Sequence, residues 1–231
     1  MSRRGARRRN SKYGSVSFAR AAERRRFYLE RGLRKRPVAT GTSLLRLMTL
    51  AREEIAVRPN DLFGDVPAVV DGGVAARAYA PERHTKDVDF LVAHSEYRRA
   101  SESLIARGWQ KLEDLTFPNS SLGLYGAAYE KGDLSIDVVA SDQPWAEEAL
   151  GVEAFDQTGL RVIALPYLVL MKIDSARGID QGDLTRMLGR VDDDELKRIV
   201  TIVDRHSHDP QAADDVRQYA VLGKLEWGKS P

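Results

Sequence analysis

Two aspartates stand two positions apart in a stretch whose other residues are apolar. Asp87 and Asp89 belong to segment 87–92, where they alternate with Val88 and Phe90 as in a half-buried strand. Because side chains two apart on a strand project from the same face, both carboxylates would point the same way. Two such carboxylates can share one cation, whereas burying them unpaired would be costly. The pair therefore indicates a metal site or an Arg/Lys partner, although so short a motif also occurs by chance on exposed strands.

A third aspartate, Asp137, is the single charge in segment 134–140. This segment and segment 123–129 predict a β-hairpin, because Gly132 and its polar neighbours separate two strand-like runs. Ile136 and Val138 flank Asp137, so its side chain would face away from theirs. Taken alone, Asp137 fits an exposed strand position best. Taken with Asp87 and Asp89, it supplies the further carboxylate that a two-metal site needs.

Gly72 and Gly73 form a tight turn upstream of the aspartate pair. Segment 66–70 before them predicts a short buried strand, and segment 74–79 after them predicts a short helix. Glycines at such a turn let a phosphate approach the backbone, where the start of the helix offers N–H groups. Many strand–turn–helix junctions look like this, so the two glycines alone are weak evidence for phosphate binding.

Segment 69–92, which joins the glycines to the aspartate pair, resembles the signature of the DNA polymerase β-like nucleotidyltransferase superfamily. That signature is an apolar strand, Gly followed by Gly or Ser, a connecting segment and an Asp-x-Asp strand. Segment 164–188 is similar to the helical region of the small bacterial members. The AbiEii-like, toxin-type branch is the most similar, and the likeness covers about residues 65–190.

The resemblance implies a nucleotidyltransferase with a defined set of site residues. Asp87, Asp89 and Asp137 would be catalytic and would bind two magnesium ions, or Mn²⁺ in their place. Gly72 and Gly73 would bind the nucleotide phosphates through their backbone. One residue departs from the pattern: Asp71 occupies a position before the glycines that is usually apolar, where its charge would repel phosphate unless it is paired.

Lys172 and Arg177 are the nucleotide-binding cations that the resemblance implies. Lys172 lies among apolar residues of the predicted helix 166–177, where a lysine often only extends its amine to solvent. The likeness to the family favours a phosphate contact instead. Asp180 and Asp183 would orient these cations, although capping of the next helix is the simpler explanation for Asp180.

The sequence predicts an α+β fold, with a small mixed β-sheet nucleotidyltransferase core, flanking helices and a helical C-terminal region. We expect a basic N-terminal arm at 1–40, partly disordered or helical, the core at 41–165, and the helical region at 166–231. Helices are predicted at 15–33, 43–57, 96–107, 145–150, 166–177, 180–190, 193–206 and 211–224.

Composition excludes several classes of protein. The 231 residues contain no cysteine, which excludes disulfides, thiol catalysis and cysteine-ligated zinc. No apolar run is long enough to span a bilayer, and the arginine-rich start lacks the apolar stretch of a secretory signal. We therefore expect a soluble, cytoplasmic protein with no membrane partner.

Charge is distributed unevenly along the chain. Residues 1–37 hold 14 Lys/Arg and 2 Glu, a balance of +12, which leaves −10 for the rest of a chain whose total is +2. A basic arm gains affinity for a polyphosphate by counterion release, and an arm that folds back onto the acidic body is equally compatible.

We expect transfer of a nucleoside monophosphate from an NTP to a hydroxyl of RNA, with tRNA as the first candidate. The enzyme would then act as a toxin with a cognate antitoxin. One alternative is an aminoglycoside nucleotidyltransferase, because the acidic body would attract the cationic drug. The other is a catalytically degenerate module that binds a nucleotide or a partner protein.

Overall fold

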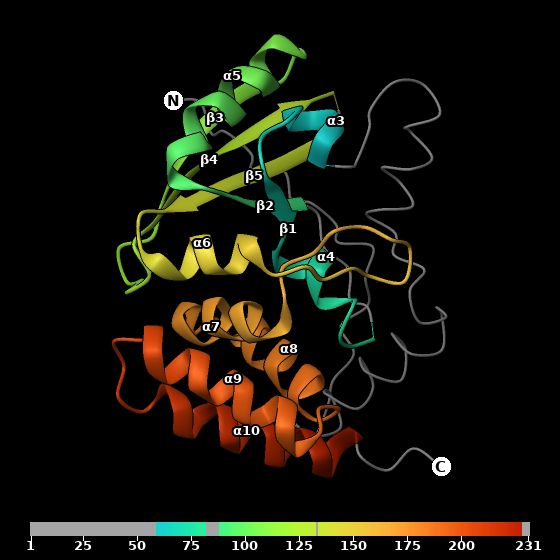
Figure 1. Ribbon diagram of the computed structural model, residues 1–231, viewed down its shortest axis with the longest axis vertical. Helices are drawn as coiled ribbons and strands as arrows, with labels where there is room; N and C mark the ends of the chain where they lie inside the picture. Colours follow the sequence, from blue (N-terminus) through green and yellow to red (C-terminus); the bar gives the residue numbers. More distant parts are fainter. Residues whose placement is uncertain (1–58, 82–87, 133, 228–231) are drawn as a thin grey trace, which may run out of the picture. The chain divides into compact units, whose positions relative to one another are not determined.

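The computed structural model describes residues 59–81, 88–132 and 134–227 (Figure 1). These residues all belong to one compact unit, Val38–Pro231. The predicted arm at 1–40, the helices predicted at 15–33 and 43–57, and Asp87 lie outside the described residues. Within the described ranges, no helix combines the length and the apolar character needed to cross a membrane.

The centre of the fold is a five-stranded mixed sheet with the strand order β1-β2-β5-β4-β3. β2 and β5 pair in parallel, and every other neighbouring pair is antiparallel. The strands are β1 (Ala68–Val70), β2 (Val88–Val92), β3 (Gln110–Thr116), β4 (Leu124–Lys131) and β5 (Leu134–Ser141). The predicted α+β class is therefore confirmed, and so is the hairpin of β4 and β5.

The sequence did not predict β3. Its residues are almost all exposed and mostly charged or polar, so neither an apolar run nor clean alternation marks the segment. It forms a strand because it follows α5 and lies at the edge of the sheet, where one partner, β4, is sufficient. Long-range pairing, and not local propensity, makes this segment extended.

Most of the helices lie close to their predicted ranges. Helix 193–206 is observed at those bounds, and Asp192 caps it by accepting from the N–H groups of Asp194 and Glu195. The helices are α3 (Pro59–Phe63), α4 (Gly72–Ala76), the 3₁₀ turn η2 (His94–Glu96), α5 (Tyr97–Ala106), α6 (Pro144–Gly151), α7 (Leu165–Ser175), α8 (Gly178–Leu188), α9 (Asp193–His206) and α10 (Ala212–Trp227).

The two faces of the sheet carry different partners. The rings of Phe63 on α3 and Phe90 on β2 meet edge to face with centroids 5.1 Å apart, and α5 packs against α3. Because neighbouring side chains on a strand alternate between faces, Asp89 points away from Phe90 and toward the other face. That second face is the one that meets α7 across the cavity described below.

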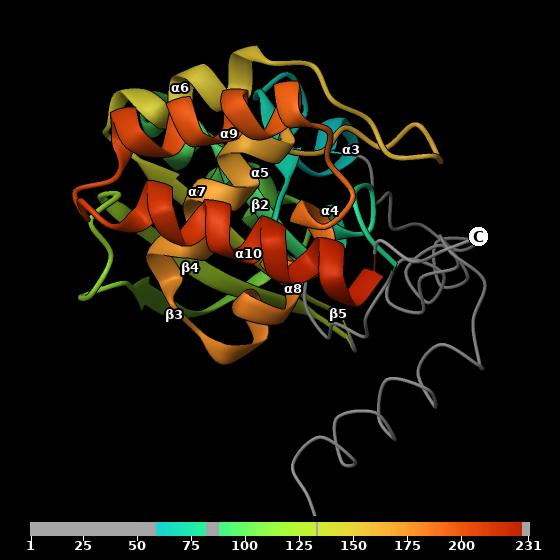
Figure 2. The same cartoon turned by 90° about the horizontal axis from the view of Figure 1, so that it is seen from below.

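The last four helices, α7 to α10, pack together beside the sheet (Figures 1 and 2). Helix α10 lies unusually close to α8 and to Gly189, the residue that follows α8. A Cβ atom built on Gly223 would lie 2.1 Å from the backbone oxygen of Thr185, and one built on Gly189 would lie 2.4 Å from the carbonyl carbon of Gly223. Backbone atoms cannot move aside cheaply, so these glycines set how closely the helices approach.

We predict that Gly223→Ala lowers the free energy of unfolding by about 1–3 kcal/mol, because an added methyl overpacks a backbone contact. Gly182→Ala on α8 is the matched control, since its added Cβ would find its nearest atom 4.0 Å away, at the end of Arg186. The control should be neutral, or more stable by about 0.5–1 kcal/mol through its helix propensity. Urea titration followed by circular dichroism measures the free energy of unfolding of both variants. Equal values for Gly223→Ala and Gly182→Ala would contradict the close contact.

Candidate active site

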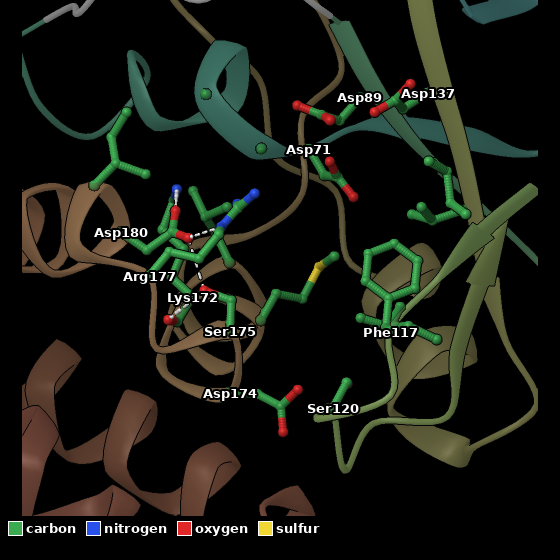
Figure 3. Close-up of a pocket in the computed structure, with 18 of the residues that line it drawn as sticks. Asp71, Asp89, Phe117, Ser120, Asp137, Lys172, Asp174, Ser175, Arg177 and Asp180 are labelled. Carbon is green, nitrogen blue, oxygen red and sulfur yellow. Dashed lines mark hydrogen bonds and ion pairs between the residues drawn. The ribbon is translucent and has the colours of Figure 1, made fainter. Parts of the chain in front are cut away.

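Asp89 and Asp137 lie directly opposite one another on the two parallel strands of the sheet. The register of β2 and β5 pairs these two residues, so that both half-buried side chains project from the same face (Figure 3). Neighbouring strands are separated by about 4.8 Å, which places two like charges side by side. The structure therefore brings together two of the three predicted acids, and Asp87 falls outside the described residues.

Gly72 makes room for the Asp89 carboxylate. Its φ of +60° is a left-handed conformation that favours glycine, and a Cβ built there would lie 1.9 Å from Oδ2 of Asp89. Gly72 was predicted to let a phosphate approach the backbone. In the structure the space left by its missing side chain is filled by the carboxylate, so this glycine positions an acid. Gly73 is buried in the first turn of α4.

Asp71 is buried beneath the acid pair. It occupies the N-cap position of α4 without capping the helix, it is 2% exposed, and its Oδ2 has no hydrogen-bond partner within residues 59–81, 88–132 and 134–227. Burial first, and then the charge of Asp89, raise the pKa of the Asp71 carboxyl well above its ordinary value. The acid that departs from the family pattern is therefore one that favours its protonated form.

Lys172 is held by two buried carboxylates. Its Nζ donates to Asp180 Oδ1 at 2.7 Å and to Asp183 Oδ2 at 2.8 Å, and the lysine side chain is 4% exposed. Asp180 also accepts from Ser175 Oγ at 2.7 Å and from Arg177 Nε at 2.6 Å. The explanation of Lys172 as a lysine that extends to solvent is therefore wrong, because its amine lies in a buried polar network.

Asp180 orients the two cations and does not cap a helix. Helix α8 begins at Gly178 with Arg177 in the N-cap position, so the predicted capping role of Asp180 is wrong. Burial alone would raise the pKa of Asp180, but the charge of Lys172 and the hydrogen bonds from Arg177, Lys172 and Ser175 hold it below its ordinary value. The left-handed Ala176, with φ of +51°, makes the turn that brings Arg177 back over Asp180.

Counted over the described residues alone, the network carries a net positive charge. It has three cations, Lys172, Arg177 and Arg186, against the two carboxylates of Asp180 and Asp183. Arg177 is 70% exposed at its side chain, and only its Nε is bound to Asp180. Both Lys172 and Arg177 line the same cavity as the acids, so this charge faces the space in front of Asp89.

The cavity has a volume of about 490 Å³ and lies between the sheet and α7. Figure 3 shows the acids along one side, the Lys172 network along a second, and Phe117 across from that network. Asp174 and Ser120 lie at the end opposite the acids. The sequence did not single out Phe117, Ser120 or Asp174, because no motif marks them and a half-buried Asp on a helix resembles any surface acid.

Carboxylate oxygens are suitable ligands for magnesium, and two of the predicted three are described in place. No group of three or more His, Cys, Asp or Glu side chains that could hold a metal ion occurs within residues 59–81, 88–132 and 134–227. The predicted third ligand, Asp87, immediately precedes β2, two residues from Asp89. The paired oxygen donors of Asp89 and Asp137 therefore fit a hard divalent cation.

Comparison with known proteins gave similarity to solved structures alone. No protein-family model and no curated protein sequence matches the chain. Two similar structures are the crystal structure of ANT(2″)-Ia in complex with adenylyl-2″-tobramycin and the solution structure of the antibiotic-resistance factor ANT(2″)-Ia. Each is 15% identical with a TM-score of 0.37, over 80% of this chain and 96% or 95% of the other chain. A TM-score this low does not identify a family, so the chemistry is inferred below from the residues of this chain.

We predict that Lys172→Met lowers the free energy of unfolding at pH 7 by about 3–5 kcal/mol, because it leaves two carboxylates buried without their ammonium. The slope of the free energy of unfolding against pH should also change sign in this variant. In the wild type the folded pKa of Asp180 lies below the unfolded value of about 3.9, so stability falls as the pH drops below 4. Without Lys172, burial would raise that pKa, and the variant would gain stability between pH 7 and 4.

Urea midpoints at pH 7, 5 and 4 test this prediction. Lys197→Met is the control, because Lys197 pairs with Asp194 on the exposed face of α9 and should change stability by less than about 1 kcal/mol. Parallel pH profiles for the wild type and Lys172→Met would show that Lys172 does not hold the charge of Asp180.

Proposed function

We propose that this chain is a metal-dependent nucleotidyltransferase that moves a nucleoside monophosphate from an NTP to an acceptor hydroxyl. The observation that carries the proposal is the in-register pair Asp89 and Asp137, which faces a cavity bordered by the positively charged Lys172 network. Two carboxylates beside net positive charge suit a substrate that carries both a phosphate chain and a bound cation. A surface pair of acids would need neither the cavity nor the network.

Each described residue has a distinct role in this proposal. Asp89 and Asp137, with Asp87, would hold magnesium, which when bound neutralises triphosphate charge and lowers the pKa of the acceptor hydroxyl. Asp137 would accept the proton of that hydroxyl. Gly72 keeps Asp89 in place, and the N–H groups of Gly72 and Gly73 would meet phosphate oxygens.

The two cations would bind the triphosphate. A lysine amine has three N–H bonds, and Asp180 and Asp183 take two of those of Lys172, which leaves one for a phosphate oxygen. Arg177 offers the rest of its guanidinium, because only Nε is bound. Binding to Asp180 fixes both cations before the nucleotide arrives, so less side-chain freedom is lost when it binds.

The acceptor has two candidates, and each rests on a different part of the chain. The RNA acceptor, with tRNA first, rests on the charge of residues 1–37, which lie outside the described residues. The AbiEii-like toxin role with a cognate antitoxin likewise stays a prediction from the sequence. The aminoglycoside acceptor rests on the cavity, whose lining includes Asp89, Asp137 and Asp174 outside the Lys172 network. These carboxylates favour a cationic acceptor.

The first test is an assay of label transfer with magnesium, each labelled NTP, and total tRNA, an aminoglycoside panel or no acceptor. We expect transfer that falls by at least about 100-fold in Asp137→Asn, because both proton acceptance and metal binding are lost. Label on tRNA supports the RNA acceptor, and label on the drug supports the aminoglycoside. Asp204→Asn, an exposed substitution on α9, is the control for charge. A protein that binds NTP but transfers to nothing would be the degenerate binding module.

We predict that Gly72→Ala also lowers transfer by at least about 100-fold, because the new methyl occupies the position of the Asp89 carboxylate and misplaces it. Gly151→Ala at the end of α6 is the matched control, since its added Cβ would meet no atom within 4 Å. Steady-state rates with saturating NTP and magnesium give the comparison. Full activity in Gly72→Ala would mean that the Asp89 carboxylate need not lie where the structure places it.

A further inference from the structure

The end of the cavity opposite the acids contains a carboxylate that the proposed reaction does not use. Asp174, on the last turn of α7, accepts through Oδ1 from the N–H of Ser121 at 2.9 Å and from Ser121 Oγ at 2.7 Å. Its Oδ2 is buried and has no hydrogen-bond partner among the residues that the structure describes. In the described part of the chain, no Lys, Arg or His lies within ion-pair distance of Asp174.

A carboxylate in this state needs a donor. Buried polar atoms are nearly always hydrogen-bonded, and a buried charge without a counter-charge is costly. The neutral donors of Ser121 fix the orientation of Asp174 but do not balance its charge. Lys172 and Arg177 lie along another side of the cavity in Figure 3, and among the described residues neither forms an ion pair with Asp174.

The surroundings of Asp174 indicate which ligand would provide the donor. Phe117 lies across the cavity in Figure 3, half-buried, and Met171 also lines the cavity. A carboxylate and an aromatic ring that line the same cavity both attract an organic cation, the first through its charge and the second through its face. The same carboxylate would repel phosphate, so the triphosphate belongs at the Lys172 end and the Asp174 end is left for the acceptor.

We infer that Asp174 is the specificity-determining residue for the acceptor, and that it selects a small molecule bearing a protonated amine. The amine would bind Asp174 near the ring of Phe117, while a hydroxyl of the same molecule extends toward Asp89 and Asp137. This inference rests on the proposed function for the identity of the bound molecule as an acceptor. Because Oδ2 is buried, the atoms that cover it must move for the amine to reach it.

Equilibrium binding without nucleotide tests the inference directly. The probes are tobramycin, spermidine and tobramycin with its amines acetylated, measured by isothermal titration calorimetry on the full chain. We expect the two amines to bind and acetylated tobramycin not to bind. Asp174→Asn keeps an oxygen for Ser121 and removes the charge, so it should weaken amine binding by about 10- to 100-fold.

Two further variants separate binding from folding. Phe117→Leu leaves the contact between Asp174 and Ser121 intact and should weaken amine binding by about 3- to 10-fold through loss of the aromatic face. Asp204→Asn changes the net charge equally on exposed α9 and should leave binding unchanged. Unfolding midpoints of all variants identify any that bind poorly because they fold poorly.

Several results would overturn the inference. The first is that neither amine binds the wild type. The second is that the amines bind Asp174→Asn as tightly as the wild type. The third is that acetylated tobramycin binds as tightly as tobramycin. Binding of total tRNA that depends on Asp174 while the amines do not bind would assign this end to RNA. If nucleotide is transferred but Asp174→Asn does not change amine binding, the inference about Asp174 is wrong and the proposed function stands. If amines bind through Asp174 but no nucleotide is transferred to any acceptor, the proposed function is wrong and amine binding at Asp174 stands.

Discussion

The parallel pairing of β2 with β5 brings two like charges together, and the other charged groups around the cavity are arranged around this pair. Asp89 and Asp137 are neighbours by register, so neither can move away without breaking the central pair of strands. Two carboxylates at that spacing repel one another in a partly dry site, and Asp71 adds a third acid beneath them. A cation bound there, as in the proposed function, would relieve the repulsion.

The helical region supplies the opposite charge with a different geometry. Lys172, Asp180 and Asp183 sit on two successive helices, and the left-handed turn at Ala176 lets those helices face each other. A buried ion network of this kind adds little stability over an apolar core, so the role we assign to it is the positioning of Lys172 and Arg177. It holds Lys172 and Arg177 at one border of the cavity while the acids hold the other, so the proposed phosphates and the proposed metal would have separate sides.

Much of this organisation could be predicted from the sequence, and the failures have physical reasons. Strand-like apolar patterns predict β2, β4 and β5, and helical periodicity with the acidic residues at its start predicts α9. The pairing of Asp89 with Asp137 follows from segments far apart in sequence, so spacing alone could suggest it but not establish it. Edge strand β3 was missed because its exposed, charged residues carry no pattern. Of the two roles predicted for Asp180, capping is wrong, because local position cannot show that the Asp180 carboxylate meets Lys172. Asp174 was overlooked because only the fold places it in a cavity.

The exposed edge of the sheet has a consequence for the cavity. β3 pairs with β4 alone in the described part of the chain, and its outward charges, such as Lys111 and Glu113, discourage other chains from adding a strand there. A strand held on one side frays more readily than one held on both. Phe117 and Ser120 follow immediately after this strand, whereas the acids lie on strands paired on both sides. Breathing of the edge would therefore move Phe117 while Asp89 and Asp137 stay fixed, so that one wall of the cavity would move independently of the two acids.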